Sequence, residues 1–337
     1  MKNFACSCGQ RIFFENTQCM NCKRFLGYDF VASTMMDFSI DGNVWTNQSG
    51  DRYRPCKNSI QYGVCNWMIS EKSDHHYCLS CSLNKMIPAI TAPKKRQWWL
   101  NMETAKRRLV VTLQKLNLPL ESKHNHDDGL AFAFLEDKRM NPAVKEEFVA
   151  TGHKEGLITV NLAEADDARR ERTRVEMGEL YRTLLGHFRH ESGHYYFERL
   201  LRKSPLLEEF RQLFGDERAD YNEALKKYYQ DSSTFTSNSD FISDYAQSHP
   251  FEDWAECWAH YLHMVDTLET ASWAGIIDHD MDMARHDIDQ WLNDWSLVTI
   301  KLNSLNRSMG LKDAYPFVLS EKTLTKIRFV HQVVNPK

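Results

Sequence analysis

Apolar residues recur at helical spacing in the stretch that follows residue 100. Three or four positions separate Met102, Ala105, Leu109, Leu113 and Leu116. Residues at this spacing lie on one face of a helix, which can then pack against the core. Proline cannot continue a helix, so Pro119 limits the element. The pattern predicts a helix from about Asn101 that ends before Pro119.

Two short apolar runs predict β-strands between the helical stretches. They cover residues 131–135 and 156–162, and Gly, Asn and Asp residues bound them. A second helical pattern contains Met177, Leu180 and Leu184 and continues to aromatic residues at 195–197, which predicts a buried helix. Further helical patterns follow residue 200. We therefore expect the α+β class, mainly helical with a small sheet.

The composition is that of an ordinary globular protein. Of the 337 residues, 42% are hydrophobic and 26% are charged, which is enough for two or three domains with their own cores. No apolar run approaches the roughly 20 residues of a membrane span, and the start lacks the apolar stretch of a signal peptide. We expect a cytoplasmic protein without a membrane partner.

The cysteines are concentrated at the start of the chain, where eight of the nine precede residue 82. The first quartet is Cys6, Cys8, Cys19 and Cys22, and the second is Cys56, Cys65, Cys78 and Cys81. A Cys-x-x-Cys pair places two thiolates on one turn, and two pairs form the tetrahedral sulfur cage that zinc prefers. The cysteines predict two structural zinc sites in a zinc-ribbon-type module at residues 1–85.

Several alternatives stay open for the cysteines. Cys6 and Cys8 have one intervening residue where a ribbon usually has two, and iron would also fit four thiolates. His75 or His76 could replace Cys56 or Cys65 in the second quartet. A disulfide framework would need an oxidising compartment, of which the sequence has no sign. The ninth cysteine, Cys257, is expected to be a small core residue.

A boundary is expected at residues 86–100, where two prolines and a basic cluster follow the cysteine-rich part. A second domain would then cover residues 101–337. Residues 1–100 hold 12 Lys or Arg against 7 Asp or Glu, although the net charge of the chain is −4. This basic surplus is mild, so a protein partner for the module is favoured over nucleic acid.

The chain contains His-Glu-x-x-His at residues 190–194, inside the second helical pattern. His190 and His194 are four positions apart, so they lie on one helix face and can reach one metal ion about 2 Å away. The intervening Glu191 borders the same site, where it can take a proton from water and pass it to a leaving amine. The motif predicts a zinc hydrolase.

A catalytic zinc held by two histidines needs a third protein ligand. A helix predicted to start at Pro250 carries Glu252 and Glu256 one turn apart, and Ser248 is expected to cap it. Spacing alone does not choose between the two glutamates. Four further histidines could compete for the metal or take capping and core roles, namely His187, His249, His260 and His263.

These motifs resemble those of the gluzincin metallopeptidases, and in particular of their lethal-factor branch. That branch carries Glu-x-x-Ala-Glu-x-aromatic with the ligand first and a tyrosine seven residues earlier. The matching positions here are Glu252, Glu256, Trp258 and Tyr245. Together with the cysteine-rich module, nearly the whole chain resembles the bacterial "putative zinc-binding metallopeptidases" with an amino-terminal zinc ribbon. The resemblance implies a zincin-like metallopeptidase domain at residues 101–337.

The resemblance also implies ligands and an activity. A catalytic zinc would be bound by His190, His194 and Glu252, with Glu191 as general base and acid. The implied reaction is hydrolysis of peptide bonds in a peptide or protein substrate, and the chain would hold three Zn²⁺, one catalytic and two structural. The alternative is a regulator that binds nucleic acid or protein through the cysteine module, with a non-catalytic scaffold at its carboxyl end.

Two further residues receive supporting roles from the resemblance. Glu256 would accept a hydrogen bond from the outer ring nitrogen of a ligand histidine and so fix its tautomer. Tyr245 would donate a hydrogen bond to the oxyanion that forms during hydrolysis.

Overall fold

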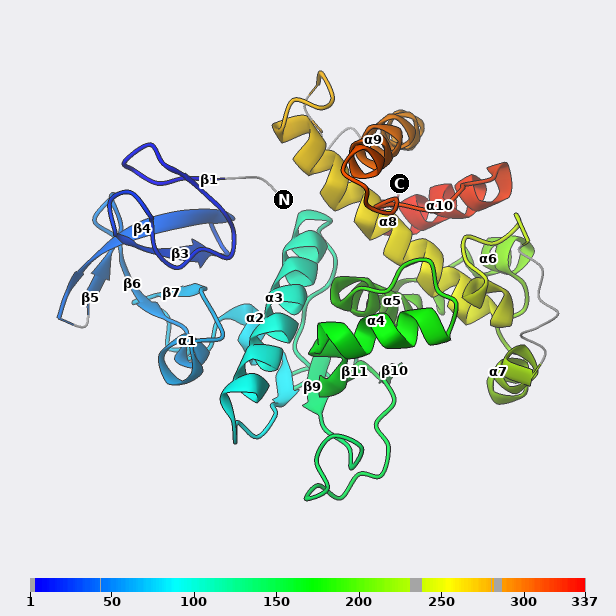
Figure 1. The fold of residues 1–337 in the computed structure, drawn as a ribbon, viewed down its shortest axis with the longest axis horizontal. Coiled ribbons are helices and arrows are strands. Elements are labelled where there is room, and N and C mark those ends of the chain that lie inside the picture. The colour runs from blue at the N-terminus through cyan, green and yellow to red at the C-terminus, as the bar shows by residue number, and fades with distance from the viewer. Residues whose placement is uncertain (1–3, 43, 231–237, 280, 282–286, 337) are drawn as a thin grey trace. The chain divides into compact units, whose positions relative to one another are not determined.

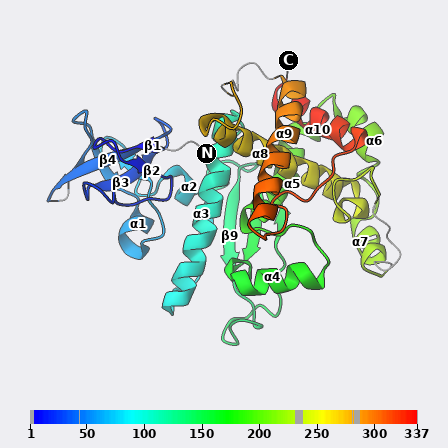
Figure 2. The ribbon, with the colours of Figure 1, turned by 45° about the horizontal axis from the view of Figure 1, so that its top comes forward.

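The computed structural model describes residues 4–42, 44–230, 238–279, 281 and 287–336. These residues form two compact units (Figures 1 and 2). The first contains the residues up to 152 together with 156–170, and the second contains 153–155 and 171–337. Helices predominate over several small sheets, which confirms the predicted α+β class. The domain boundaries predicted on either side of residues 86–100 remain a prediction.

Short strands build the cysteine-rich part of the first unit. β1 (Phe4–Ala5) and β2 (Arg11–Ile12) form an antiparallel hairpin. An antiparallel sheet then follows the chain order through β3 (Phe25–Asp29), β4 (Thr34–Asp41), β5 (Val44–Thr46), β6 (Arg52–Pro55) and β7 (Met68–Ser70). Two short helices, α1 (Lys57–Tyr62) and α2 (Leu79–Ser82), begin directly after Cys56 and Cys78.

Three strands in parallel form the rest of the first unit's core. β8 (Asn84–Met86) and β11 (Leu157–Asn161) both pair in parallel with β9 (Ala131–Leu135). β10 (Gly152–Lys154) lies where the chain passes from the first unit to residues 153–155 of the second. The two strands predicted from apolar runs are therefore confirmed as β9 and β11. A short 3-10 turn, η1 (Leu162–Ala165), follows β11.

Helix α3 (Pro93–Lys115) lies over β9 and starts eight residues earlier than Asn101, where the sequence placed it (Figure 1). Pro93 is the first helical residue, a position where its missing N–H is not needed. The predicted apolar face is buried, since Met102, Leu109 and Leu113 have no exposed surface. Pro93 thus starts a helix inside residues 86–100, the segment in which only a domain boundary was expected.

Helix α3 also buries charged residues. Glu103 and Lys106 are fully buried, and the ammonium of Lys106 lies 2.9 Å from a carboxylate oxygen of Glu103. The amide of Asn84 and the indole N–H of Trp99 donate to the other oxygen at 2.7 and 3.0 Å. A buried charge is costly unless it is paired, so this network fixes how α3 meets β8.

Helix α8 (Pro250–Trp273) is the central element of the second unit. α5 (Leu184–Tyr196), α9 (Ile288–Ser308) and α10 (Glu321–Val334) pack against it (Figures 1 and 2). The remaining elements are α4 (Asp167–Glu176), the π-helical turn η2 (Phe197–Leu201), α6 (Leu207–Phe214), α7 (Tyr221–Gln230) and the 3-10 turn η3 (Tyr245–Ser248). None of the described helices combines the length and apolar composition needed to cross a membrane.

Helix α5 begins later than its apolar pattern predicted. Met177 and Leu180 precede it and are 48% and 64% exposed, so they do not belong to its buried side. Thr183 caps the helix, because its hydroxyl accepts a hydrogen bond from the backbone N–H of Gly186 at 3.0 Å. From Leu184 onward the predicted burial is confirmed.

Helix α8 is capped by a different residue than predicted. The Ser248 hydroxyl donates to the backbone oxygen of Tyr245 and makes no cap. The N-cap is His249, whose Nδ1 accepts a hydrogen bond from the N–H of Phe251 at 3.1 Å. Pro250 then occupies the first helical position, as expected.

Gly193 sets the distance between α5 and α8. A Cβ atom at this position would lie 2.9 Å from Cα of Ala255 and 3.2 Å from Cβ of Trp258. The indole N–H of Trp254 donates to the backbone oxygen of Gly193 at 2.8 Å, and that of Trp258 donates to Ser192 Oγ at 3.0 Å. The helix backbones therefore touch at a point one residue away from His194.

Gly193→Ala should destabilise the second unit. The gain of about 1 kcal/mol in helix propensity is smaller than the roughly 1–3 kcal/mol cost of forcing the two backbones apart. Denaturant unfolding of the full chain should show a lower midpoint. Gly152→Ala is the control, since a Cβ there meets no atom within 4 Å. A variant at 193 as stable as the wild type would contradict the close contact.

Candidate metal centre

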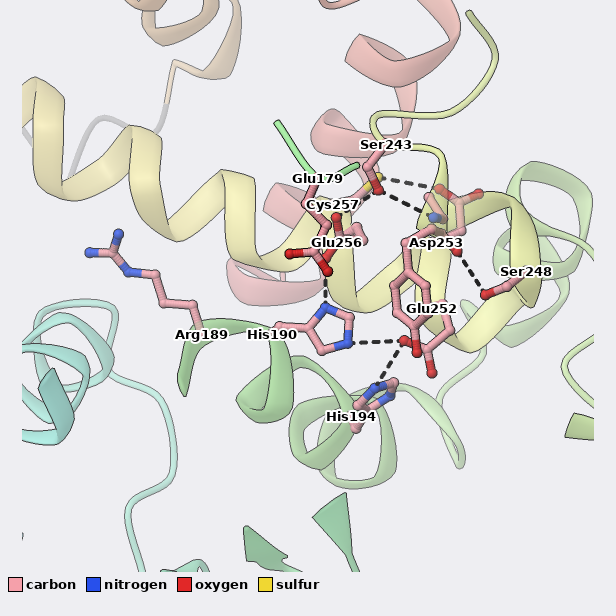
Figure 3. Close-up of polar contacts among 12 residues, drawn as sticks. Glu179, Arg189, His190, His194, Ser243, Ser248, Glu252, Asp253, Glu256 and Cys257 are labelled. Carbon is pink, nitrogen blue, oxygen red and sulfur yellow. Dashed lines mark hydrogen bonds and ion pairs between the residues drawn. The ribbon is translucent and has the colours of Figure 1, made fainter. Parts of the chain in front are cut away.

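Three side chains from α5 and α8 bring their ligand atoms to one point (Figure 3). Nε2 of His190 lies 2.9 Å from Oε2 of Glu252, and Nε2 of His194 lies 3.6 Å from the same oxygen. Atoms about 2.0–2.1 Å from a tetrahedral zinc ion lie roughly 3.3 Å from one another, so this spacing fits zinc. Two imidazoles and a carboxylate also match the donor set of catalytic zinc sites with an open position.

His190 is held between two carboxylates (Figure 3). Its Nδ1 lies 2.7 Å from Oε1 of Glu256, and the hydroxyl of Ser243 donates to the other oxygen of Glu256 at 2.7 Å. Because Nδ1 can donate its proton to Glu256, the lone pair of Nε2 is directed toward Glu252. Burial alone would lower the pKa of His190, but hydrogen bonds from the imidazole to the two glutamates raise it. The pocket thus favours a cation at this point.

The two oxygens of Glu252 have different partners. Oε2 faces the histidines, while Oε1 accepts a hydrogen bond of 2.6 Å from the hydroxyl of Tyr221 on α7. Only 1% of the Glu252 side chain is exposed. Burial by itself would raise the pKa of Glu252. The positive charge and the hydrogen bonds of His194 and His190 outweigh that effect and hold the pKa well below its ordinary value, so the carboxylate is ionised. It can serve as an anionic ligand.

Tyr245 lies beside the same centre, and Glu191 is near enough for its charge to act on Tyr245. Glu191 is buried on α5, and Tyr245 on η3 has its ring centroid 6.0 Å from that of His190. The pKa of Tyr245 is raised well above its usual value by burial, then by the charge of Glu252 and, to a lesser degree, of Glu191. The Tyr245 hydroxyl therefore keeps its proton and can donate a hydrogen bond.

The other candidate histidines have structural partners. Nε2 of His249 lies 3.1 Å from the backbone oxygen of Ala219, and Nδ1 of His260 lies 2.6 Å from the hydroxyl of Tyr315. His263 pairs with Arg189. None of them, nor His187, belongs to the ligand groups of the described residues.

Two residues beside the ligands were not predicted, Tyr221 and Ser243. Tyr221 is the first residue of α7 and Ser243 lies just before η3, so both are between the two motifs in sequence. No spacing rule relates either residue to a motif. Ser243 is two positions before Tyr245, and a serine there is an unremarkable loop residue. Only the tertiary fold, which brings α7 and the segment before η3 to α8, places their hydroxyls on the two glutamates.

The first cysteine quartet forms one group of ligand atoms. Cys6, Cys8, Cys19 and Cys22 lie within reach of a single ion. The sulfurs of Cys6 and Cys22 are 3.5 Å apart, and those of Cys8 and Cys19 are 3.6 Å apart. Sulfurs at about 2.3 Å from a tetrahedral zinc lie roughly 3.8 Å from one another, so the geometry fits.

The single residue between Cys6 and Cys8 has its own support. The N–H and the hydroxyl of Ser7 both donate to the buried carboxylate of Asp37 on β4, at 3.1 and 2.9 Å. Arg24 pairs with the same carboxylate at 2.9 Å. This anchor explains how a turn one residue shorter than usual still points both sulfurs to one place.

The second quartet is more deeply placed. Cys56, Cys65, Cys78 and Cys81 are all buried and form one ligand group, and neither His75 nor His76 belongs to it. Sulfurs of Cys65 and Cys78 are 3.7 Å apart. None of the nine cysteines takes part in a disulfide, so the structure does not have a disulfide framework. Cys257 is buried in α8 near Asp253, as a core residue would be.

Comparison with known proteins identifies the family. The family described as "Putative zinc-binding metallo-peptidase" matches residues 95–333. The chain belongs to this family. A zinc-ribbon domain family matches residues 3–92. Both findings confirm the resemblance to the zinc-binding metallopeptidases with an amino-terminal zinc ribbon, and such a family agrees with the donor set described above.

Similar proteins occur in mycobacteria. One uncharacterized protein of Mycobacterium bovis and uncharacterized proteins of two Mycobacterium tuberculosis strains are each 41% identical to this metallopeptidase family member over 348 residues. The match covers 99% of this chain and 96% of each relative, so the similarity extends along nearly the whole length of both proteins. No solved structure matches the chain.

His260 should make the second unit sensitive to acid. Burial lowers its pKa to about 4, against about 6.5 in the unfolded chain. Between these values the unfolded chain binds a proton that the folded chain does not, so stability falls as the pH drops from 6.5 to 4.

His260→Gln cannot titrate but can still accept a hydrogen bond from Tyr315. Unfolding free energies at pH 7 and pH 4.5 should therefore differ less in the variant than in the wild type, by about 2–3 kcal/mol. Other groups titrate equally in the wild type and in His260→Gln, so their effects cancel when the pH-dependent losses of unfolding free energy are compared. An equal loss in both would show that His260 does not carry the effect.

Proposed function

We propose that this chain is a zinc-dependent peptidase whose reaction centre is formed by His190, His194, Glu252 and Glu191. The observation that carries the proposal is the convergence of three ligand atoms, all within 4.8 Å of one another, in a member of a zinc-binding metallopeptidase family. The substrate would be a peptide or a protein. Location in the cytoplasm and protein recognition by the cysteine-rich module remain predictions.

The His190, His194 and Glu252 side chains would hold the zinc. When bound, the ion would polarise the substrate carbonyl and lower the pKa of water to about 7. The chain's own residues supply the proton transfer. Glu191 takes a proton from the attacking water at its carboxylate and passes it to the nitrogen of the leaving amine, so that the C–N bond breaks with a neutral amine as product.

Two further side chains support this reaction in the proposal. Tyr245 keeps its proton and donates a hydrogen bond to the carbonyl oxygen as negative charge develops on it. Glu256, itself held by Ser243, accepts the proton of His190 Nδ1 and so keeps the ring in one orientation. Both roles are those expected from the resemblance.

The two cysteine quartets would hold structural zinc. Each quartet offers four sulfurs to one ion, which fills all four positions of a tetrahedral zinc site and leaves none for substrate. Together with the reaction centre they give three zinc ions per chain. They would secure the short strands of the cysteine-rich part, which has few residues for a core of its own.

Glu191→Gln should strongly slow peptide hydrolysis while zinc remains bound, because the amide keeps the size of the side chain but accepts no proton. A panel of unstructured proteins can be screened for cleavage by mass spectrometry, and the variant then assayed on the fragments found. The expected loss in kcat is about 10²-fold or more. Glu198→Gln, an exposed glutamate of η2, is the matched control. Normal cleavage by the Glu191 variant would refute the mechanism.

Tyr245→Phe should lower kcat by about 10²–10³-fold with little change in KM, because the lost hydrogen bond acts only as the oxyanion forms. Steady-state kinetics on the same substrate measure this split. A rise in KM at constant kcat would instead assign Tyr245 to substrate binding.

Metal analysis of the purified chain should find three zinc ions. The double variant His190→Ala/His194→Ala should contain two, since both cysteine quartets remain intact. Plasma emission spectrometry of dialysed protein gives these numbers. Equal metal content in the two proteins would contradict a zinc site between α5 and α8.

A further inference from the structure

Tyr221 joins α7 to the carboxylate of Glu252. Its hydroxyl donates to Oε1 at 2.6 Å, while Oε2 of the same carboxylate lies 2.9 and 3.6 Å from the two histidine nitrogens. The two oxygens are thus assigned to different partners, one to a phenol and one to the ligand group. Neither motif in the sequence contains this tyrosine.

The position of Tyr221 is set by the cap of α8. The rings of Tyr221 and His249 meet edge to face with centroids 5.2 Å apart. Nδ1 of His249 accepts from Phe251 N–H, so Nε2 carries the proton and donates to the backbone oxygen of Ala219 at 3.1 Å. The chain just before α7 is therefore tied to the residue that starts α8, three positions before Glu252.

These contacts form a closed loop of interactions. Ala219 is held by His249, His249 caps the helix that carries Glu252, and Glu252 is held by Tyr221, two residues after Ala219. A rotation of the Glu252 carboxylate would leave Oε1 without its donor in a side chain that is 1% exposed. The loop therefore favours one orientation of the carboxylate.

We propose that Tyr221 is a positioning residue that makes Glu252 bind the zinc through one oxygen only. The inference rests on the proposed function, since it concerns the same ion. A carboxylate that used both oxygens would occupy a further coordination position, which the attacking water needs. Tyr221 would thus preserve the open position without touching substrate or metal.

The experiment uses the full chain with Tyr221→Phe, which removes one oxygen atom. Tyr221 is 37% exposed and α7 has no fully buried residue, so the variant should fold. A mild chelator first removes the ion of the reaction centre while the cysteine quartets stay loaded with zinc. Zinc affinity is then measured by competition with a chromophoric chelator, and Co²⁺ is added to a second sample for its visible spectrum.

In Tyr221→Phe we expect a zinc affinity weakened by about 10–100-fold, as is typical when a partner of a metal ligand is lost. The Co²⁺ absorption should also become weaker as both Glu252 oxygens bind and the coordination number rises. Tyr229→Phe, on the same helix with its ring half exposed, is the control and should match the wild type within twofold. A purely structural role for Tyr221 would lower stability and leave the Co²⁺ spectrum unchanged.

The outcomes separate this inference from the proposed function. If the wild type binds the third ion and cleaves peptides, but Tyr221→Phe has the wild-type affinity and Co²⁺ spectrum, the positioning role is wrong and the peptidase stands. If the wild type takes up no ion beyond those of the cysteine quartets, both are wrong. A changed affinity together with a changed spectrum supports the role of Tyr221.

Discussion

The contact between α5 and α8 at Gly193 is the constraint on which the metal centre depends. His190 and His194 come from one helix and Glu252 from the other, so their ligand atoms meet only if the two backbones are in van der Waals contact. Gly193 permits this approach, and the indoles of Trp254 and Trp258 fix it through hydrogen bonds to α5. The packing of the second unit therefore requires glycine at position 193, directly before His194.

The charges that meet at the contact between α5 and α8 favour a cation. The helices bring two carboxylates, Glu252 and Glu256, against one buried imidazole, an arrangement that is costly unless positive charge balances it. A proton on His190 balances it in the absence of metal, and a divalent cation between His190, His194 and Glu252 would balance it better. Hydroxyl donors then satisfy the remaining carboxylate oxygens, so the centre has one orientation for each ligand.

In the first unit, too, buried negative charge is balanced by a positive charge, but the residues are different. Its second cysteine quartet is buried, and the guanidinium of Arg107 on α3 donates to the backbone oxygen of Val64 at 2.7 Å, directly before Cys65. Burial would lower the pKa of Arg107, but the charges of Cys65 and Glu103 raise it. A four-thiolate zinc site carries net negative charge, so a buried cation beside it offsets part of the cost. A zinc ion in this quartet would thereby link the cysteine-rich strands to α3.

Local patterns in the sequence were sufficient for the parts of the molecule that depend on nearest neighbours. Helical periodicity predicted α3 and the buried part of α5, apolar runs predicted β9 and β11, and the cysteine spacings predicted groups that the structure brings together. Errors occurred at element ends. α3 starts at Pro93, Met177 and Leu180 lie outside α5, and His249 caps α8 instead of Ser248, because the ends of helices depend on which neighbour can satisfy their free N–H groups.

The sequence by itself determined which side chains could serve together as metal ligands, because histidines four apart and paired cysteines define candidate ligand sets through local geometry alone. Only the tertiary structure decided how Glu252 and Glu256 differ in position. Both lie on one face of α8, and the distance between α8 and α5 turns the first toward the ligand nitrogens and the second toward the outer nitrogen of His190. The tertiary structure alone also placed the Tyr221 hydroxyl against the Glu252 carboxylate. The two residues are 31 positions apart, and a contact at that separation arises from packing and produces no periodic pattern in the sequence.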